Sequence, residues 1–158
     1  MNVLTPALSV KSLNEINLKK YWETGKRGII LDLDNTITPW NEMELSQEAR
    51  SFLKDALCLN YKVFLLTNAK RKRTEEIAQK YAIPYLASAF KPKKSAFIKA
   101  LAVMDLKGEK VLVIGDQIFT DILGGNRVGC YTILVPPISQ REFIFTKFFR
   151  LLETLFRH

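Results

Sequence analysis

Residues 28–34 read Gly-Ile-Ile-Leu-Asp-Leu-Asp, a short apolar run that follows two cations and ends in two acids. A strand buried on both faces of a sheet has this near-continuous apolar pattern. Its two carboxylates, Asp32 and Asp34, arrive where the strand is expected to end. The segment therefore predicts a central parallel strand that delivers acidic side chains to one edge of a sheet.

Similar strands recur along the chain and alternate with helical patterns. Apolar runs at 61–66, 111–116 and 131–135, with a shorter one at 83–86, predict further strands, while 46–57, 71–81, 93–104 and 119–126 have helical spacing. Ser46 is the expected N-cap of the first helix, and Gly124-Gly125 the expected end of the last. Alternating strands and helices predict an α/β fold with a doubly wound, mostly parallel sheet.

Polar residues follow several of these strands. Asp32 and Asp34 follow the first, Thr67-Asn68 the second, and Asp116 ends the run at 111–116. Ligands of doubly wound sheets bind beyond the carboxyl ends of the strands. We therefore expect these side chains to share one site.

The acids at this edge suit a hard metal ion. Asp32 and Asp34 are two residues apart, so a turn beginning at Asp34 must redirect one of them toward a common site. Asp116 and Asp121 would add oxygen ligands from a later loop, and such a cluster would repel itself without a cation. We expect Mg²⁺ there.

A carboxylate beside Mg²⁺ can attack phosphorus and form an acyl phosphate. Asp32 is the candidate nucleophile, and Asp34 the acid/base that protonates the leaving group and later deprotonates water. Thr67 and Lys91 are candidates for binding the phosphoryl oxygens. Lys93 and Lys94 compete with Lys91 for that role.

Composition narrows the chemistry further. Lys and Arg number 24 against 16 acids, a formal charge of +8 that favours anionic partners. The one histidine is His158, which excludes Ser-His-Asp and Cys-His mechanisms and most histidine-ligated zinc sites. Cys58 and Cys130 lie far apart and fit reduced thiols in a cytosol. No signal peptide or apolar run of about 20 residues is apparent, so we expect a cytoplasmic location.

Four segments taken in order resemble a known set of motifs. They are 32–36 (Asp-Leu-Asp-Asn-Thr), Thr67-Asn68, Lys91-Pro92 and 115–121 (Gly-Asp-Gln-Ile-Phe-Thr-Asp), and they are similar to the four motifs of the haloacid dehalogenase (HAD) superfamily of phosphatases. Residues 33–40 and 115–129 look like the YqeG and phosphatidylglycerophosphate phosphatase branch of its subfamily IIIA.

This resemblance implies a role for each matching residue. Asp32 would be the nucleophile and Asp34 the acid/base, and the metal ligands would be Asp32, Asp34 through its backbone carbonyl, and Asp116. The phosphate-binding residues would be Thr67, Asn68 and Lys91, and Asp121 and Thr36 would support the site.

The resemblance also bears on the substrate. The segments between the motifs hold no more than a linker and a helix, so we expect no cap domain and an open site. An open site favours a phosphate on a membrane-held molecule, and the branch suggests hydrolysis of phosphatidylglycerophosphate to phosphatidylglycerol. Two alternatives stay open. One is a phosphatase of a soluble nucleotide or sugar phosphate. The other is an RNA- or ribosome-binding regulatory module that uses basic residues such as 70–73, although a nucleic-acid partner is not the one we expect.

The chain is expected to form one domain, 1–158, that ends in an amphipathic helix at 141–158. Apolar pairs at 144/145, 148/149, 151/152 and 155/156 form one wide helical face. The helix could hold the protein peripherally on the inner membrane face, or pack on the sheet as a last core helix.

Overall fold

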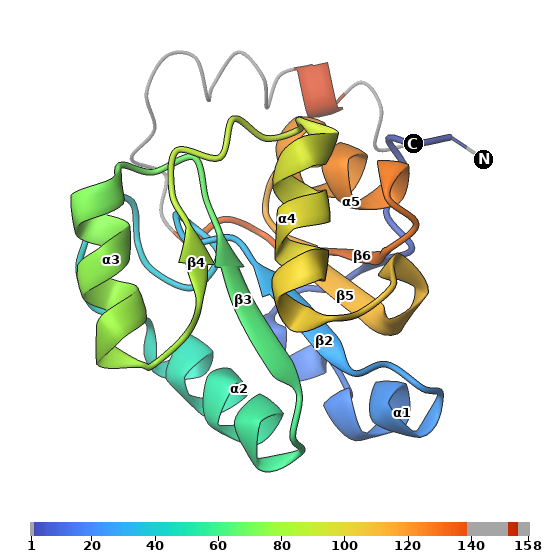
Figure 1. Ribbon diagram of the computed structural model, residues 1–158, viewed down its shortest axis with the longest axis horizontal. Helices are drawn as coiled ribbons and strands as arrows, with labels where there is room; N and C mark the ends of the chain where they lie inside the picture. The colour runs from blue at the N-terminus through green and yellow to red at the C-terminus, as the bar shows by residue number, and fades with distance from the viewer. Residues whose placement is uncertain (1, 139–151, 155–158) are drawn as a thin grey trace.

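The computed structural model describes residues 2–138 and 152–154 and contains a six-stranded sheet (Figure 1). All strand pairs are parallel, in the order β1-β6-β5-β2-β3-β4. The strands are β1 (Leu8–Ser9), β2 (Gly28–Leu31), β3 (Lys62–Leu66), β4 (Tyr85–Leu86), β5 (Val111–Gly115) and β6 (Tyr131–Leu134). The predicted doubly wound α/β fold is confirmed.

Helices connect the strands in the described part of the chain. The α-helices are α1 (Leu18–Glu23), α2 (Gln47–Cys58), α3 (Arg71–Lys80), α4 (Lys94–Met104) and α5 (Leu123–Arg127). Two short 3₁₀ turns, η1 (Leu13–Glu15) and η2 (Gly108–Lys110), and a π-helix, η3 (Ile118–Ile122), complete the order.

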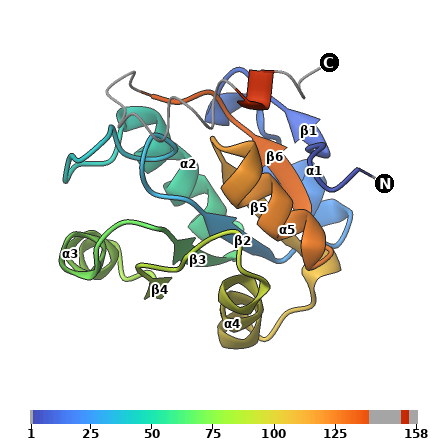
Figure 2. The ribbon, with the colours of Figure 1, turned by 90° about the horizontal axis from the view of Figure 1, so that it is seen from above.

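The helices form a layer on each face of the sheet. Alternate residues of β2 point to opposite faces, so Ile29 and Leu31 pack with α2 while Ile30 packs with α4. Figure 2 shows α2 and α4 on opposite sides of the strands. Two hydrophobic layers therefore hold β2, β3 and β5 in the centre of the molecule.

Helix α2 shows how the local sequence builds these layers. The Ser46 side chain accepts a hydrogen bond from the Ala49 backbone N–H at 3.1 Å, so the predicted N-cap is confirmed. The buried residues of α2 recur at helical spacing: Ala49, Phe52, Leu53 and Ala56.

The glycine pair lies just before the helix end that the sequence predicted it to form. Gly124 and Gly125 lie inside α5, which continues to Arg127, and the helical region before them is a π-helix. A Cβ atom at Gly124 would lie 2.1 Å from Cε2 of Phe97. The pair therefore lets α5 approach α4 and the sheet closely, a tertiary requirement that chain-local signals do not contain.

The ends of the chain add elements that the apolar runs did not predict. Strand β1 pairs with β6 at the edge of the sheet, and α1 follows it before β2. Most of the predicted helix at 141–158 lies outside the described residues. Within that range only 152–154 are described, and they are helical. In the described parts of the chain, every helix is too short or too polar to cross a bilayer.

No cap domain interrupts the described residues. The segment from Asp32 to Ser46 joins β2 directly to α2, and the segment between β3 and β4 holds only α3 and its flanking turns. The carboxyl edge of the sheet is therefore not covered by an inserted domain, as predicted.

Replacing Gly124 with Ala tests the close approach of α5 to α4. Because Phe97 is fully buried, its ring cannot move aside freely, and we expect overpacking to lower the free energy of unfolding by about 1–3 kcal/mol. Urea unfolding would measure this loss, with Val103→Ala on the exposed side of α4 as the control. In a Phe97→Leu background the added loss should be smaller, and a more stable Gly124→Ala protein would contradict the packing argument.

Candidate active site

The register of the sheet brings the predicted site residues to one edge. Leu31 of β2 pairs with Leu65 of β3 and with Ile114 of β5, so the three strands end almost level. Asp32, Thr67 and Asp116 follow these ends.

Three carboxylates lie together at this edge. One oxygen each of Asp32, Asp116 and Asp121 lies within 4.8 Å of the others, and all three residues are buried. Buried carboxylates are costly unless paired or bound to a cation. Their oxygen-only chemistry is what a hard divalent ion requires.

Lys91 is the ammonium partner of this cluster. Its Nζ lies 2.6 Å from Oδ1 of Asp32 and 2.6 Å from Oδ1 of Asp121. Burial lowers the pKa of Lys91, but the two carboxylates outweigh this effect and raise the pKa above its ordinary value. The side chain is therefore a fixed positive charge.

The other two lysines of this loop lie elsewhere. Lys93 and Lys94 are exposed, and the Lys93 Nζ lies 5.6 Å from the ring centroid of Phe90. Of the three lysines that the sequence left as candidates for binding phosphate, only Lys91 therefore lies beside the carboxylates.

Asn68 fixes the backbone that carries this lysine. Its Oδ1 accepts a hydrogen bond from the Lys91 backbone N–H at 2.7 Å, and its amide nitrogen donates to the Lys91 carbonyl at 3.4 Å. The peptide bond between Lys91 and Pro92 is cis. Asn68 therefore positions Lys91, and its predicted contact with phosphate stays a prediction.

Asp121 is brought beside Asp32 by the π-helix η3. The Gln117 backbone N–H donates to its Oδ2 at 3.3 Å, and a Cβ atom at Gly115 would lie 2.1 Å from the same oxygen. Only glycine leaves room for this carboxylate. Burial and the neighbouring charge of Asp32 raise the pKa of Asp121 to about 7, against the opposing effect of Lys91.

Thr36 joins two of the carboxylates. Its hydroxyl lies 3.2 Å from Oδ2 of Asp32 and 3.3 Å from Oδ1 of Asp116. A hydroxyl has one proton to donate, so the two acceptors share it. Thr36 therefore links the carboxylates that follow β2 and β5, and its supporting role stays a prediction.

Asp34 leaves the strand in the predicted turn, but its side chain lies outside the carboxylate cluster. Asn35 has a left-handed backbone (φ 60°) and its N–H donates to the Thr38 carbonyl. The Asp34 Oδ1 lies 2.7 Å from a guanidinium nitrogen of Arg73. Burial raises the pKa of Asp34, an effect that Arg73 opposes and the charge of Asp32 reinforces.

Arg73 is a site residue that sequence reasoning missed, because a basic run at a helix start is usually solvated. Its Nε and a second nitrogen also donate to the Glu42 carbonyl at 2.9 and 2.6 Å. Arg73 thus ties the Asp34 carboxylate to the loop at Glu42. Its place in the basic run that begins soon after Thr67-Asn68 was the available signal.

Glu153 was also missed. It is buried, and its Oε1 accepts hydrogen bonds from the backbone N–H groups of Ile118 at 2.7 Å and Phe119 at 3.3 Å. These groups begin the π-helix that carries Asp121. Nothing in the local sequence around Glu153 indicates so distant a partner.

A cavity of about 360 Å³ opens above the cluster. The Thr67 hydroxyl accepts a hydrogen bond from the Ala69 backbone N–H at 3.0 Å, which leaves its own proton to donate. The residues that line the cavity include predicted site residues and side chains from the loops around them: Asp32, Asp34, Trp40, Thr67, Asn68, Ala69, Lys91, Pro92, Gln117, Phe119 and Thr120.

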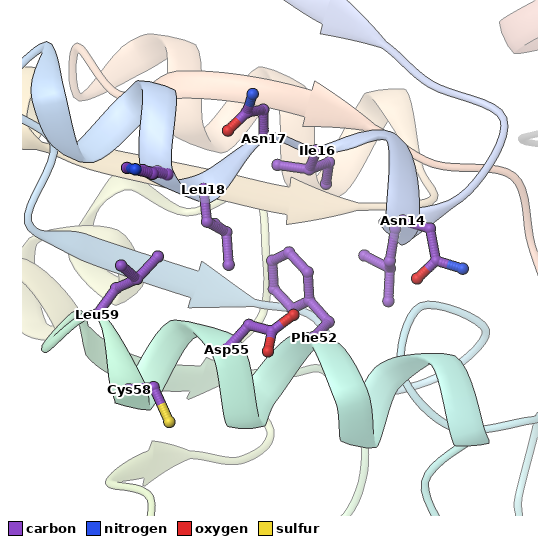
Figure 3. Close-up of a pocket in the computed structure, with 10 residues that line it drawn as sticks. Asn14, Ile16, Asn17, Leu18, Phe52, Asp55, Cys58 and Leu59 are labelled. Carbon is purple, nitrogen blue, oxygen red and sulfur yellow. The ribbon is translucent and has the colours of Figure 1, made fainter.

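A separate pocket of about 440 Å³ lies between α2 and the η1–α1 segment (Figure 3). Leu18 and Phe52 point into it, and Asp55 is the one acid among its lining residues. It shares no residue with the cavity above the cluster. None of the site residues predicted from the sequence lines this pocket.

Comparison with known proteins gives matches along most of the chain. Residues 88–137 match the HAD-hydrolase-like family. The chain is 36% identical over 144 residues to a Bacillus subtilis (strain 168) protein named probable phosphatase YqeG, covering 91% of this chain and 84% of that protein. It is 24% identical over 146 residues to an Arabidopsis thaliana phosphatidylglycerophosphate phosphatase 1, covering 87% of this chain and 42% of the plant protein.

A solved structure has the same fold. The cobalt-bound deoxy-D-mannose-octulosonate 8-phosphate phosphatase (YrbI) of Haemophilus influenzae superposes with a TM-score of 0.55 at 14% identity, covering 79% of this chain and 75% of that one. At this identity the likeness concerns the fold alone.

The raised pKa of Asp121 predicts how the metal-free protein responds to pH. The folded state holds this proton up to about pH 7, whereas an unfolded Asp loses it near pH 4. Between these values the folded state binds more protons, so the contribution of Asp121 to the free energy of unfolding falls as the pH rises. Urea unfolding of wild type and of Asp121→Asn, both in the presence of a chelator, measures this contribution as a difference in free energy of unfolding.

Asp105→Asn is a matched control, because Asp105 is an exposed carboxylate at the end of α4. The difference in free energy of unfolding between wild type and Asp105→Asn should not fall as the pH rises. A difference between wild type and Asp121→Asn that stays constant across this range would contradict the assignment.

Proposed function

This chain belongs to the HAD superfamily of phosphatases, and on that premise we propose that it hydrolyses phosphatidylglycerophosphate through a phosphoaspartate at Asp32, with Mg²⁺ as cofactor. The observation that carries the proposal is the buried set of Asp32, Asp116, Asp121 and Lys91, of which Asp32 and Lys91 line an open cavity. Each part of the set has a task in phosphoryl transfer.

The carboxylates fit a divalent metal ion. Three acids face one ammonium, so full ionisation leaves two negative charges in a buried place. HAD phosphatases generally depend on a divalent ion, and Asp32 and Asp116, with the Asp34 carbonyl, would hold it here. When bound, Mg²⁺ would offset the charge of the phosphoryl oxygens and of the attacking carboxylate.

Asp32 carries the covalent step. One of its carboxylate oxygens attacks phosphorus, the bond from phosphorus to the ester oxygen breaks, and the alcohol leaves with a proton from Asp34. Lys91 holds the Asp32 carboxylate in place through Oδ1. A water then loses a proton to Asp34 and attacks phosphorus, which breaks the acyl phosphate and releases inorganic phosphate.

Asp34 is suited to both proton transfers because its environment keeps its pKa above the ordinary value. Its side chain lines the cavity without joining the carboxylate cluster. Arg73 holds this carboxylate at the cavity wall. In this proposal the proton carrier and the nucleophile follow the same strand but have different cationic partners, Arg73 for Asp34 and Lys91 for Asp32.

Thr67 and Lys91 bind the transferring group. Thr67 can donate its hydroxyl proton to a phosphoryl oxygen, and the Lys91 ammonium offsets negative charge that spreads over those oxygens. Asn68 contributes by holding Lys91, and it also lines the cavity.

The open edge supports a lipid substrate. No inserted domain in the described residues could enclose a small molecule, whereas a phosphate projecting from a bilayer could enter from outside. The Arabidopsis relative is named for phosphatidylglycerophosphate, and this chain spans 42% of its length. We infer that the protein acts peripherally at the inner membrane face, with residues 141–158 as a contact.

Asp32→Asn tests the function. With Mg²⁺ and phosphatidylglycerophosphate in mixed micelles, wild type should release phosphate, and the variant should be slower by at least about a thousandfold because it lacks the nucleophile. Release of inorganic phosphate is the measurement, and p-nitrophenyl phosphate is the soluble comparison. Asp32-dependent cleavage of the soluble ester alone would favour a soluble nucleotide or sugar phosphate as substrate.

Arg73→Gln tests the environment of Asp34. Loss of the guanidinium removes the main effect that lowers the pKa of Asp34, so the limb of the pH–rate profile governed by Asp34 should move to higher pH. The profile of kcat/KM for p-nitrophenyl phosphate measures the shift. Arg71→Gln on the exposed side of α3 should leave the limb in place. A lower rate with unmoved limbs would instead assign Arg73 a structural role.

A further inference from the structure

A larger cavity adjoins the proposed catalytic cavity. It has a volume of about 760 Å³, and four residues line both: Asp34, Trp40, Asn68 and Ala69. A molecule whose phosphate reaches Asp32 would therefore continue into this second space.

The wall of this second cavity is cationic. Lys70, Lys72 and Arg73 line it where α3 begins, together with the exposed acid Glu76. Arg73 is occupied by Asp34. Lys70 and Lys72 form no ion pair with any carboxylate in the described part of the chain, so they remain available to an anion.

The basic run at 70–73 is thus divided by the helix. Arg71 does not line the cavity, its side chain is 79% exposed, and its Nε lies 3.9 Å from Glu75. The neighbouring residues Lys70 and Lys72 are also exposed, but both line the cavity. In a basic run that is merely solvated, we would not expect Lys70 and Lys72 to line one cavity while Arg71 lies outside it.

The rest of the wall is suited to a less polar part of the same ligand. Trp40 and the partly exposed Met43 lie beside the lysines in this cavity. An aromatic ring and a thioether can contact carbon-rich groups, while ammonium groups prefer anionic oxygens. The ligand expected here has a second negative charge close to a carbon skeleton.

We propose that Lys70 and Lys72 form a subsite for a second phosphate of the substrate, a phosphodiester joined through a short polyol to the phosphomonoester that Asp32 attacks. The inference rests on the proposed function and deepens it, because it makes the diester the part of the substrate that the enzyme recognises. The same chemistry occurs in an intact phospholipid and in its water-soluble deacylated headgroup.

Three substrates separate recognition of the diester from attraction to a membrane. Glycerol phosphate has the monoester alone, glycerophosphoglycerol phosphate adds the diester without acyl chains, and dihexanoyl phosphatidylglycerophosphate has both. The preference is the ratio of kcat/KM for a diester-containing substrate over that for glycerol phosphate. Wild type should prefer both diester-containing substrates.

Lys70→Gln and Lys72→Gln should each lower this preference, on the order of tenfold for loss of one charge-assisted contact. The fall should be alike for the soluble and the lipid substrate. Arg71→Gln removes the same charge from the same turn of helix and should leave both preferences unchanged. The preference is a ratio, so loss of folded protein does not imitate the effect.

Other outcomes overturn the inference. If the lysine variants reduce activity on the lipid alone, the lysines attract an anionic surface and form no diester subsite. If Arg71→Gln matches them, the effect is one of net charge. If wild type cleaves glycerol phosphate with the same kcat/KM as the diester-containing substrates, the subsite is absent but the proposed phosphatase activity stands. If none of the three substrates is cleaved in an Asp32-dependent way, the proposed function itself is refuted.

Discussion

The ammonium of Lys91 lies between Asp32 and Asp121, 2.6 Å from an oxygen of each, and the rest of the site is arranged around this contact. A single buried carboxylate would take up a proton rather than stay charged, and three together would repel one another. The lysine offsets part of that charge and joins the end of β2 to the π-helix η3. A divalent ion would offset the negative charge that Lys91 leaves uncompensated.

The scaffold meets this requirement by close packing at a few points. Parallel strands that end level bring Asp32 and Asp116 side by side, and glycine at 115 leaves room for the Asp121 carboxylate. Backbone contacts hold the remaining parts: Asn68 fixes the loop of Lys91, and Glu153 accepts from the first N–H groups of η3. A residue from the far end of the chain thus supports the element that carries an acid of the cluster.

The beginning of α3 links the proposed active site to the proposed diester subsite. Arg73 holds Asp34 at the wall that the two cavities share, and Lys70 and Lys72 extend that wall outward. Because the helix turns Arg71 away, neighbouring cations in the sequence have different surroundings. In the proposed mechanism, one helical turn therefore serves both proton transfer and substrate choice.

The sequence by itself determined the fold class, the order of most strands and helices, and the convergence of Asp32, Thr67 and Asp116, because hydrophobic periodicity and strand ends are local properties of the chain. It also indicated Lys91, but could not separate it from Lys93 and Lys94, since spacing does not state which side chain is buried. Only the tertiary structure decided that Asp34 pairs with Arg73, that Gly124 packs closely against Phe97, and that Glu153 reaches η3. Each of these depends on contact between segments far apart in sequence or on the space between packed helices, and no local pattern encodes either.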